Sequence, residues 1–346
     1  MRDLARRHGP AMLLRLGEVP TLVVSSREGA REVMRTHDTA FATRPLSATM
    51  RVLTNGGRDI IFAPYGDYWR QLRKIAVAEL LTARRVLSFR AIREEEVAAA
   101  LRGGGHDEDL LYVLLRIQKE GALQFPLDMD AIKSVIFDIF GAGSETAATT
   151  LEWAMAELIK NPRVMQKATT EVRQAFHARG TVAEHALSEL TYLHLVIRET
   201  LRLHTPLPLL LPRECQEPCQ VLGYDVPRGT QVLVNAWALG RDERYWPDAP
   251  KEFRPERFKG EAAAADFGGG DFAFLPFGAG RRMCPGMAFG LANVELALAS
   301  LLFHFDWEWS GPESAELDMT EAFGITARRR DKLVLRPVLR VPVPGV

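Results

Sequence analysis

The stretch Pro276–Gly286 reads "PFGAGRRMCPG", and its two prolines, three glycines and single cysteine specify a tight loop. An almost wholly apolar segment follows it directly, "MAFGLANVELALASLLFHF" over residues 287–305. Pro285 suits the first position of a helix, because a missing N–H costs nothing there. The pattern therefore predicts a buried helix over residues 285–304 that begins at this loop.

Cys284 lies at the predicted start of that helix, next to unpaired backbone N–H groups and the positive end of the helix dipole. Arg281 and Arg282 are its neighbours, and each of these effects favours a thiolate. Gly278 and Gly280 allow the backbone to pass close to a flat group. Such a thiolate can serve as a nucleophile, a redox centre or a metal ligand. Two plainer interpretations stay open, a buried structural cysteine and an anion site at a helix start.

The composition narrows the function classes. The 346 residues include 44 basic and 44 acidic side chains, so the chain lacks the basic surplus that nucleic-acid binding requires. An apolar content of 47% fits a folded core. Cys215 and Cys219, with Cys284, make an odd count that fits a reducing compartment, and the first two are too few for structural zinc. We see no uninterrupted apolar run of about 18 residues and therefore expect no transmembrane helix.

Helical periodicity dominates the chain, and nothing in it resembles alternation of strands and helices. The predicted fold class is mainly α with small β-sheets. A Gly-Ala-Gly run at 141–143 predicts a local distortion of the long central helix. Strands are expected within 12–26, near 219–223 and 230–234, and at the C-terminal end, and helices over 25–38, 67–79, 82–101, 109–120, 128–160, 162–178, 191–204 and 285–304.

Several paired residues have both a structural and a functional interpretation. Glu199 and Arg202 lie three apart and share one helix face, which by itself indicates an ordinary surface ion pair. Trp69 and Arg73 lie four apart, as in a cation–π or packing pair. The glycines of "GAGSET", residues 141–146, each cost about 1 kcal/mol against alanine within a helix, so a compensating contact is expected there.

The stretch "FGAGRRMCPG" resembles the haem-binding loop of the cytochrome P-450 family, Phe-x-x-Gly-x-Arg-x-Cys-x-Gly, and it fills every fixed position. The resemblance implies haem b, iron protoporphyrin IX, as the cofactor. It makes Cys284 the axial thiolate on the iron, and thiolate ligation favours O–O cleavage. It also pairs Arg282 with a haem propionate and makes Phe277, Gly278 and Gly286 parts of the cofactor-binding loop.

Other motifs of the family occur in the family's order. "AGSET" resembles the oxygen-binding groove of the central helix, where Glu145 and Thr146 form the acid–alcohol pair that delivers protons to reduced oxygen. Glu199 and Arg202 match the family's Glu-x-x-Arg pair. Through the resemblance, this pair locks to Arg257 in "PERF" and braces the cysteine loop.

The resemblance covers nearly the whole chain and is closest to plant members that oxidise specialised metabolites such as terpenoids. It makes Trp69, Arg73 and Arg213 further ligands of the haem propionates, since arginine can bind both oxygens of a carboxylate. The wall of the substrate pocket is expected to come from four segments, the loop 45–62, Phe137–Ala142, Pro206–Leu211 and Phe323–Thr326.

The implied enzyme is a haem-dependent monooxygenase that inserts one oxygen atom of O2 into a lipophilic small molecule. An NADPH-dependent flavoprotein reductase would supply the electrons and dock on the cysteine side, near Arg70, Lys74 and Arg281. The family resides at the endoplasmic reticulum membrane, on its cytosolic face. This chain begins after the family's N-terminal anchor, so we expect a cytosolic or peripheral protein with at most peripheral membrane contact.

Compared with the family, the chain also lacks an internal block of helices. We expect a single domain over residues 1–346 with an internal deletion near 102–109, which removes two bundle helices and two roof helices. Apolar faces of the helices at 128–160 and 285–304 would then be exposed. Thr205 stands where proline is usual, with a minor effect. Two alternatives stay open, a truncated and inactive family member and a non-haem helical binding module with a structural Cys284.

Overall fold

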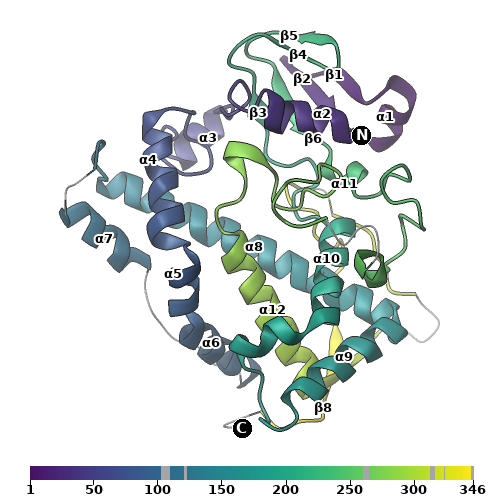
Figure 1. Cartoon of the computed structure of the whole chain (residues 1–346). Coiled ribbons are helices and arrows are strands. Elements are labelled where there is room, and N and C mark those ends of the chain that lie inside the picture. Colours follow the sequence, from purple (N-terminus) through teal and green to yellow (C-terminus); the bar gives the residue numbers. More distant parts are fainter. Residues whose placement is uncertain (103–109, 121–122, 260–264, 312–315, 323, 344–346) are drawn as a thin grey trace.

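The computed structural model describes residues 1–102, 110–120, 123–259, 265–311, 316–322 and 324–343. Apart from Arg102, the predicted deletion site at 102–109 lies outside the described residues, and so does Phe323 of the expected pocket wall. The strands β1, β2, β4 and β5 lie at one end of the molecule with α1 and α2, and α9 and β8 lie at the other end (Figure 1).

Helices form about half of the described chain, and the predicted class, mainly α with small sheets, is confirmed. The longest helix, α8, packs against α7, α9, α10 and α12. The larger helices are α4 Asp67–Ile75, α5 Ala83–Ser88, α6 Arg90–Arg102, α7 Leu110–Glu120, α8 Met129–Lys160, α9 Pro162–Phe176, α10 Thr191–Leu203 and α12 Met287–His304, and the shorter ones are α1 Arg2–His8, α2 Arg27–Arg31, α3 Ala48–Leu53 and α11 Ala236–Leu239.

Three small sheets complete the architecture. In the four-stranded sheet the strand order is β1-β2-β6-β3, and β2 pairs in parallel with β6 although some two hundred residues separate them. The other two sheets are antiparallel pairs. The strands are β1 Ala11–Leu16, β2 Val19–Val24, β3 Arg213–Glu214, β4 Cys219–Val221, β5 Tyr224–Val226, β6 Gln231–Val234, β7 Phe305–Trp309 and β8 Leu335–Leu339.

The structure corrects several predicted elements. The helix expected over 82–101 is two helices, because Phe89 leaves helical geometry between α5 and α6. Helix α1 was not predicted. Helix α3 lies within the stretch 45–62 that was expected to be a loop, and Ser47 at its start accepts a hydrogen bond from the backbone N–H of Met50 at 3.2 Å. Local propensity was too weak to indicate these short helices, which are fixed by capping and packing.

Helix α8 is continuous through Gly141 and Gly143, so the glycines expected to distort it do not interrupt it. Asp128 caps its N-terminus and accepts a hydrogen bond from the Ala131 N–H at 2.9 Å. Phe137 and Phe140, in the middle of α8, have exposed fractions of 55% and 73%. Such large apolar side chains are normally covered, and their exposure agrees with the expectation of an uncovered apolar face on this helix.

Helix α12 packs against α8, α9 and α10. None of its large apolar side chains is fully exposed, contrary to the expectation for residues 285–304. In the described part of the chain, α12 is also the one helix whose length and composition would suffice to cross a membrane. The helix is not an uninterrupted apolar run, since it contains Asn293 and Glu295, and it belongs to the packed core formed with α9 and α10.

Candidate active site

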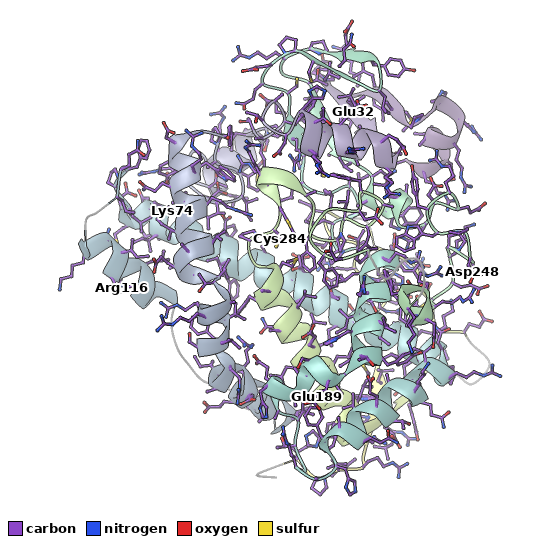
Figure 2. All side chains as sticks on the ribbon, in the orientation of Figure 1. Glu32, Lys74, Arg116, Glu189, Asp248 and Cys284 are labelled. Atoms are coloured by element: carbon purple, nitrogen blue, oxygen red, sulfur yellow. The ribbon has the colours of Figure 1, made fainter. Side chains whose placement is uncertain are left out.

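The cysteine loop, residues 276–286, is closed by its own backbone. The N–H of Cys284 donates to the carbonyl of Phe277 at 2.9 Å, across a short 3-10 turn over Gly280–Arg282. Helix α12 begins at Met287 with Gly286 as its N-cap residue, rather than at Pro285. Cys284 therefore lies in the interior, just before the N-terminal end of α12 (Figure 2).

Two glycines of this loop have backbone conformations that other residues rarely adopt. Gly278 has φ 70° and Gly280 has φ 69°. At Gly280 the space is also closed, because a Cβ atom would lie 2.3 Å from the Met34 carbonyl oxygen and 2.6 Å from Oδ1 of Asp38. The approach of the loop to the segment that follows α2 thus depends on glycine at this position.

We expect Gly280→Ala to lower the free energy of unfolding by at least about 1–3 kcal/mol, because it combines a strained φ with a backbone clash. Denaturant titration followed by circular dichroism would measure the change. Gly141→Ala in α8 is the matched control, since nothing lies within 4 Å of its added Cβ, and it should stabilise by up to about 1 kcal/mol. Equal effects of the two substitutions would contradict this account.

The surroundings of the Cys284 thiol differ from the expectation. Burial raises the pKa of Cys284 above its ordinary value, and a hydrogen bond from the Gly286 N–H and the charge of Arg73 lower it in part. The cation that acts on the sulfur is thus Arg73 of α4, not the neighbouring Arg281 or Arg282. A buried thiol of this kind loses its proton readily only on binding a metal cation.

An apolar cavity lies in front of Cys284, between α8, α12 and the loop before β3. Its walls contain Phe277, Gly278, Arg282 and Gly286 of the cysteine loop. Of the segments expected to form the pocket wall, the lining includes Ile60, Ile61, Asp138, Ile139, Ala142, Pro206, Leu207, Leu210 and Leu211, but neither Phe137 nor any described residue of 324–326.

Arg282 and Trp69 meet at one side of this cavity. The guanidinium of Arg282 lies 4.2 Å from the centre of the Trp69 ring and donates to the carbonyls of Ala42 and Ala63, each at 2.5 Å. The indole N–H of Trp69 donates to the Ile60 carbonyl at 3.0 Å. Burial, followed by the nearby charge of Arg213, lowers the pKa of Arg282 to about 9. Both side chains are therefore held in place by backbone acceptors.

Arg73 and Arg213 line the same cavity from other elements. Arg73 of α4 donates to the carbonyl of Met283 at 2.5 Å, which ties α4 to the cysteine loop. Arg213 of β3 donates to the Ala279 carbonyl at 2.8 Å and lies 3.5 Å from Asp38. Burial lowers the pKa of both arginines.

Sequence reasoning missed a fourth arginine of the cavity, Arg44. It is 7% exposed, donates to the Pro212 carbonyl at 3.0 Å, and its Nε atom has no hydrogen-bond partner among the described residues. The only signal was its position directly before Pro45 and the loop expected over 45–62. Burial and the charges of Arg282 and Arg213 lower the pKa of Arg44 strongly.

The four arginines create a surplus of buried positive charge at the edge of the cavity. Asp38 and Asp59 are the carboxylates that act on them. Buried charges require partners, and Nε of Arg44 remains a free donor. A planar apolar ligand with two carboxylates fits this arrangement, and haem with its two propionates is such a ligand. The residues of the cavity, including Cys284, therefore fit haem.

The structure places the two members of the acid–alcohol pair expected on α8 in different surroundings. Thr146 lines the cavity, and its hydroxyl donates to the Ala142 carbonyl at 2.6 Å. Glu145 is not among the lining residues. Its carboxylate accepts a hydrogen bond from the Thr326 hydroxyl at 2.6 Å and lies 3.6 Å from Arg328.

Glu199, Arg202 and Arg257 lie together, although the pair in α10 alone indicated a surface interaction. Arg202 binds both carboxylate oxygens of Glu199 at 2.7 and 2.8 Å, and Nε of Arg257 reaches the same carboxylate at 2.9 Å. The side chains of Glu199 and Arg202 are completely buried. Arg202 also donates to the carbonyls of Pro250 and Glu252, so the cluster holds the chain before the cysteine loop against α10.

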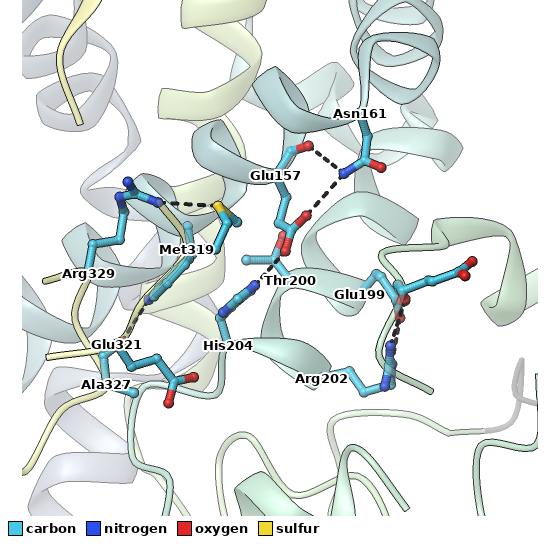
Figure 3. A network of polar contacts seen from close by, with 12 residues as sticks. Glu157, Asn161, Glu199, Thr200, Arg202, His204, Met319, Glu321, Ala327 and Arg329 are labelled. Atoms are coloured by element: carbon cyan, nitrogen blue, oxygen red, sulfur yellow. Dashed lines mark hydrogen bonds and ion pairs between the residues drawn. The ribbon is translucent and has the colours of Figure 1, made fainter. Parts of the chain in front are cut away.

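A second buried pair lies beside this cluster, on the neighbouring turn of α10 (Figure 3). His204 directly follows the last residue of α10, and its Nε2 atom lies 2.7 Å from Glu157 of α8. The His204 ring stacks on Trp153 with the ring centres 3.9 Å apart. Burial lowers the pKa of His204, and its contacts join α8 to α10 outside the cavity.

The family model described as Cytochrome P450 matches residues 1–103 and 95–333, nearly the whole chain. The chain belongs to the cytochrome P450 family. A zebrafish P450 structure with abiraterone has the same fold, with a TM-score of 0.83, 24% identity and 98% of both chains covered. The class of enzyme predicted from the sequence, a haem-dependent P450 oxidoreductase with haem b as its cofactor, is thereby confirmed, and the two alternatives are not favoured.

Two plant P450 relatives extend this comparison. Desmethyl-deoxy-podophyllotoxin synthase of Sinopodophyllum hexandrum is 42% identical over 442 residues, covering 98% of this chain and 87% of the relative. Premnaspirodiene oxygenase of Hyoscyamus muticus is 41% identical over 439 residues, covering 97% and 87%. These alignments are about a hundred positions longer than the 346 residues of this P450, so the relatives contain that many residues without a counterpart here.

Proposed function

We propose that this P450 oxidises a lipophilic plant specialised metabolite, of terpenoid or similar type, with Cys284 as the axial ligand of haem iron. One observation above all supports the proposal: a cysteine and four arginines, Arg44, Arg73, Arg213 and Arg282, line one apolar cavity. Bound haem would supply the activation of O2 at iron. The relatives named above, a desmethyl-deoxy-podophyllotoxin synthase and a premnaspirodiene oxygenase, support the substrate class.

The chain's own residues bind and orient the cofactor in this proposal. The arginines neutralise the two propionates, since their forked N–H groups match carboxylates. Trp69 holds Arg282 in place from one side, and the positive φ of Gly278 keeps the loop open over the cavity. Glu199 with its two arginines braces the segment that leads into the loop.

On the opposite wall, Thr146 is proposed to position a proton donor. Because its hydroxyl hydrogen already binds the Ala142 carbonyl, the lone pairs of Oγ1 remain available to accept a hydrogen bond from a water molecule. Glu145 lies one residue earlier and is bound to Thr326 at 2.6 Å. It can pass a proton toward the cavity only after this hydrogen bond is exchanged, and we propose it as the outer member of the relay.

The redox partner is proposed to be an NADPH-dependent flavoprotein reductase, at the cytosolic face of the endoplasmic reticulum membrane. Arg70, Lys74 and Arg281 are exposed near the cysteine loop and would attract an acidic partner. We further propose that the chain is one domain whose missing helices belong near residues 102–109. Two observations support this placement. The family model matches the chain in two segments that meet at residues 95–103, and Phe140 on α8 is uncovered.

The purified protein tests the proposal directly. We expect about one haem per chain and, after reduction under carbon monoxide, the red-shifted Soret band of thiolate-ligated haem. Turnover with a plant reductase and a panel of sesquiterpenes would then test the substrate class. Haem at a ratio near one without the red-shifted band would contradict Cys284 as the ligand, and absence of haem would contradict the whole site.

A further inference from the structure

Two buried carboxyl groups face each other at the wall of the cavity. Asp138 of α8 is 6% exposed and Asp59, in the loop before α4, is 0% exposed. Oδ2 of Asp138 accepts hydrogen bonds from the backbone N–H groups of Ile60 at 2.8 Å and Ile61 at 3.0 Å. Oδ1 of Asp59 accepts one from Phe62 at 2.9 Å. Both carboxyl groups therefore bind the same short loop, residues 59–63.

The second oxygen of Asp59 lacks a hydrogen-bond donor in the described part of the chain. Oδ2 of Asp59 is buried, and no donor among the described residues reaches it, while Asp138 is its carboxyl neighbour within hydrogen-bonding reach. Two ionised carboxylates in contact would repel each other in this low-dielectric site. A protonated Asp138 would instead donate to Asp59 and satisfy the orphan oxygen.

The surrounding charges decide which group keeps the proton. Arg44 and Arg282 attract the charge of Asp59, and the phenol of Tyr68 is the other titratable group that interacts with it. Burial raises the pKa of both carboxyl groups, and the charge of Asp59 adds to the shift at Asp138, which reaches about 8. Asp59 is thus the charged member and Asp138 the neutral one.

The other edge of the loop faces the cysteine loop. The carbonyls of Ile60, Ile61 and Ala63 accept hydrogen bonds from Arg282, and that of Ile60 also accepts one from Trp69. The loop therefore offers its N–H groups to α8 and its carbonyls to the arginine beside Cys284. Asp138 and Arg282 therefore bind the N–H groups and the carbonyls of the same two residues, Ile60 and Ile61.

We propose that Asp59 and Asp138 share one proton and act as positioning residues, clamping the 59–63 loop between α8 and Arg282 of the cysteine loop. Loss of the proton places two negative charges in contact and releases the loop from α8. The acceptors of Arg282 then loosen, and the cofactor is held less firmly. The clamp does not depend on the role proposed for Cys284, because it joins side chains that are present without the cofactor.

The sign of the pH dependence follows from linkage. Asp138 has its pKa raised from 3.8 in the unfolded chain to about 8 in the folded one. Between these values the folded state binds the extra proton, so the contribution of Asp138 to stability is fully present below about pH 4 and falls as the pH rises. It is lost once the pH passes about 8, where the folded protein also ionises.

Asp138→Asn tests the clamp because its amide N–H replaces the shared proton permanently, while its carbonyl can still accept from Ile60 and Ile61. We expect the holoprotein to show the infrared carbonyl band of a buried carboxylic acid, and Asp138→Asn to abolish it. Between about pH 6 and about pH 9 the wild type should lose thermal stability and release haem several-fold faster, and Asp138→Asn should lose this dependence. Asp138→Ala should have lower thermal stability and faster haem release than the wild type at both pH values.

Asp59→Asn is a second variant, to be used if Asp138→Asn fails to fold. Its amide can donate to Asp138, so it too should lose the carbonyl band and the pH dependence. Asp128→Asn is the matched control on the same helix. Asp128 caps α8, where Asn is equivalent, and hydrogen bonds lower its pKa, so the pH dependence of the wild type should persist. An absent carbonyl band, or an unchanged pH dependence in both Asn variants, would overturn the proposal.

Discussion

Cys284→Ser is expected to abolish the red-shifted band of the reduced, carbon monoxide-bound protein. The hydroxyl of serine is close in size but far less acidic than a thiol, so iron would lose its thiolate ligand while the cavity keeps its shape. We expect turnover to fall by at least about 100-fold, since even partners that only orient a metal ligand are worth 10–100-fold. Difference spectra and the rate of product formation measure the two effects.

Cys219→Ser is the control for this substitution. Cys219 is a partly buried cysteine of β4 that packs outside the cavity. The spectrum and turnover of the Cys219→Ser variant should therefore match those of the wild type. A red-shifted band that persists in Cys284→Ser, or that disappears equally in Cys219→Ser, would contradict the assignment of the ligand.

Glu199→Ala is expected to have the largest effect on stability. It would leave Arg202 and Arg257 without their buried carboxylate, and breaking a buried pair by removing one partner costs about 3–5 kcal/mol. This is a large share of a typical total of about 5–15 kcal/mol. Denaturant titration of the holoprotein, followed by circular dichroism and by the Soret band, would measure the loss.

Glu308→Ala is its matched control, because Glu308 pairs with Arg336 on the exposed sheet edge with half of its side chain in solvent. Exposed pairs contribute about 0–1 kcal/mol. Unfolding midpoints that shift equally in Glu199→Ala and Glu308→Ala would show that the buried cluster is no more important than a surface pair.

The sequence was sufficient to predict the cysteine loop, since its fixed residues are contiguous and the apolar helix follows directly. It also indicated the Glu199–Arg202 pair, because residues three apart on a helix share a face. Its burial could not be predicted from α10 alone. The carbonyls of 250 and 252 that accept from Arg202 come from a loop without periodicity.

Contacts between distant segments were beyond sequence reasoning. Arg44 and the Asp59–Asp138 pair lie in segments without a regular pattern or on a helix face that looked ordinary, and their partners are more than 70 residues away. The expected activation of Cys284 by Arg281 failed for the same reason. Arg281 turns toward Asp38, which accepts from its guanidinium at 2.8 Å and also from its backbone N–H.

The parallel pairing of β2 with β6 has a consequence for the order of events during synthesis. Val24 pairs with Val234, so at about 5–20 residues per second the first hairpin waits roughly 10–40 s on the ribosome for its partner strand. Arg282 donates hydrogen bonds to the carbonyls of Ala42 and Ala63, and it is translated later still. Cofactor capture is therefore a late step, and the nascent N-terminal half must stay soluble until the cysteine loop emerges.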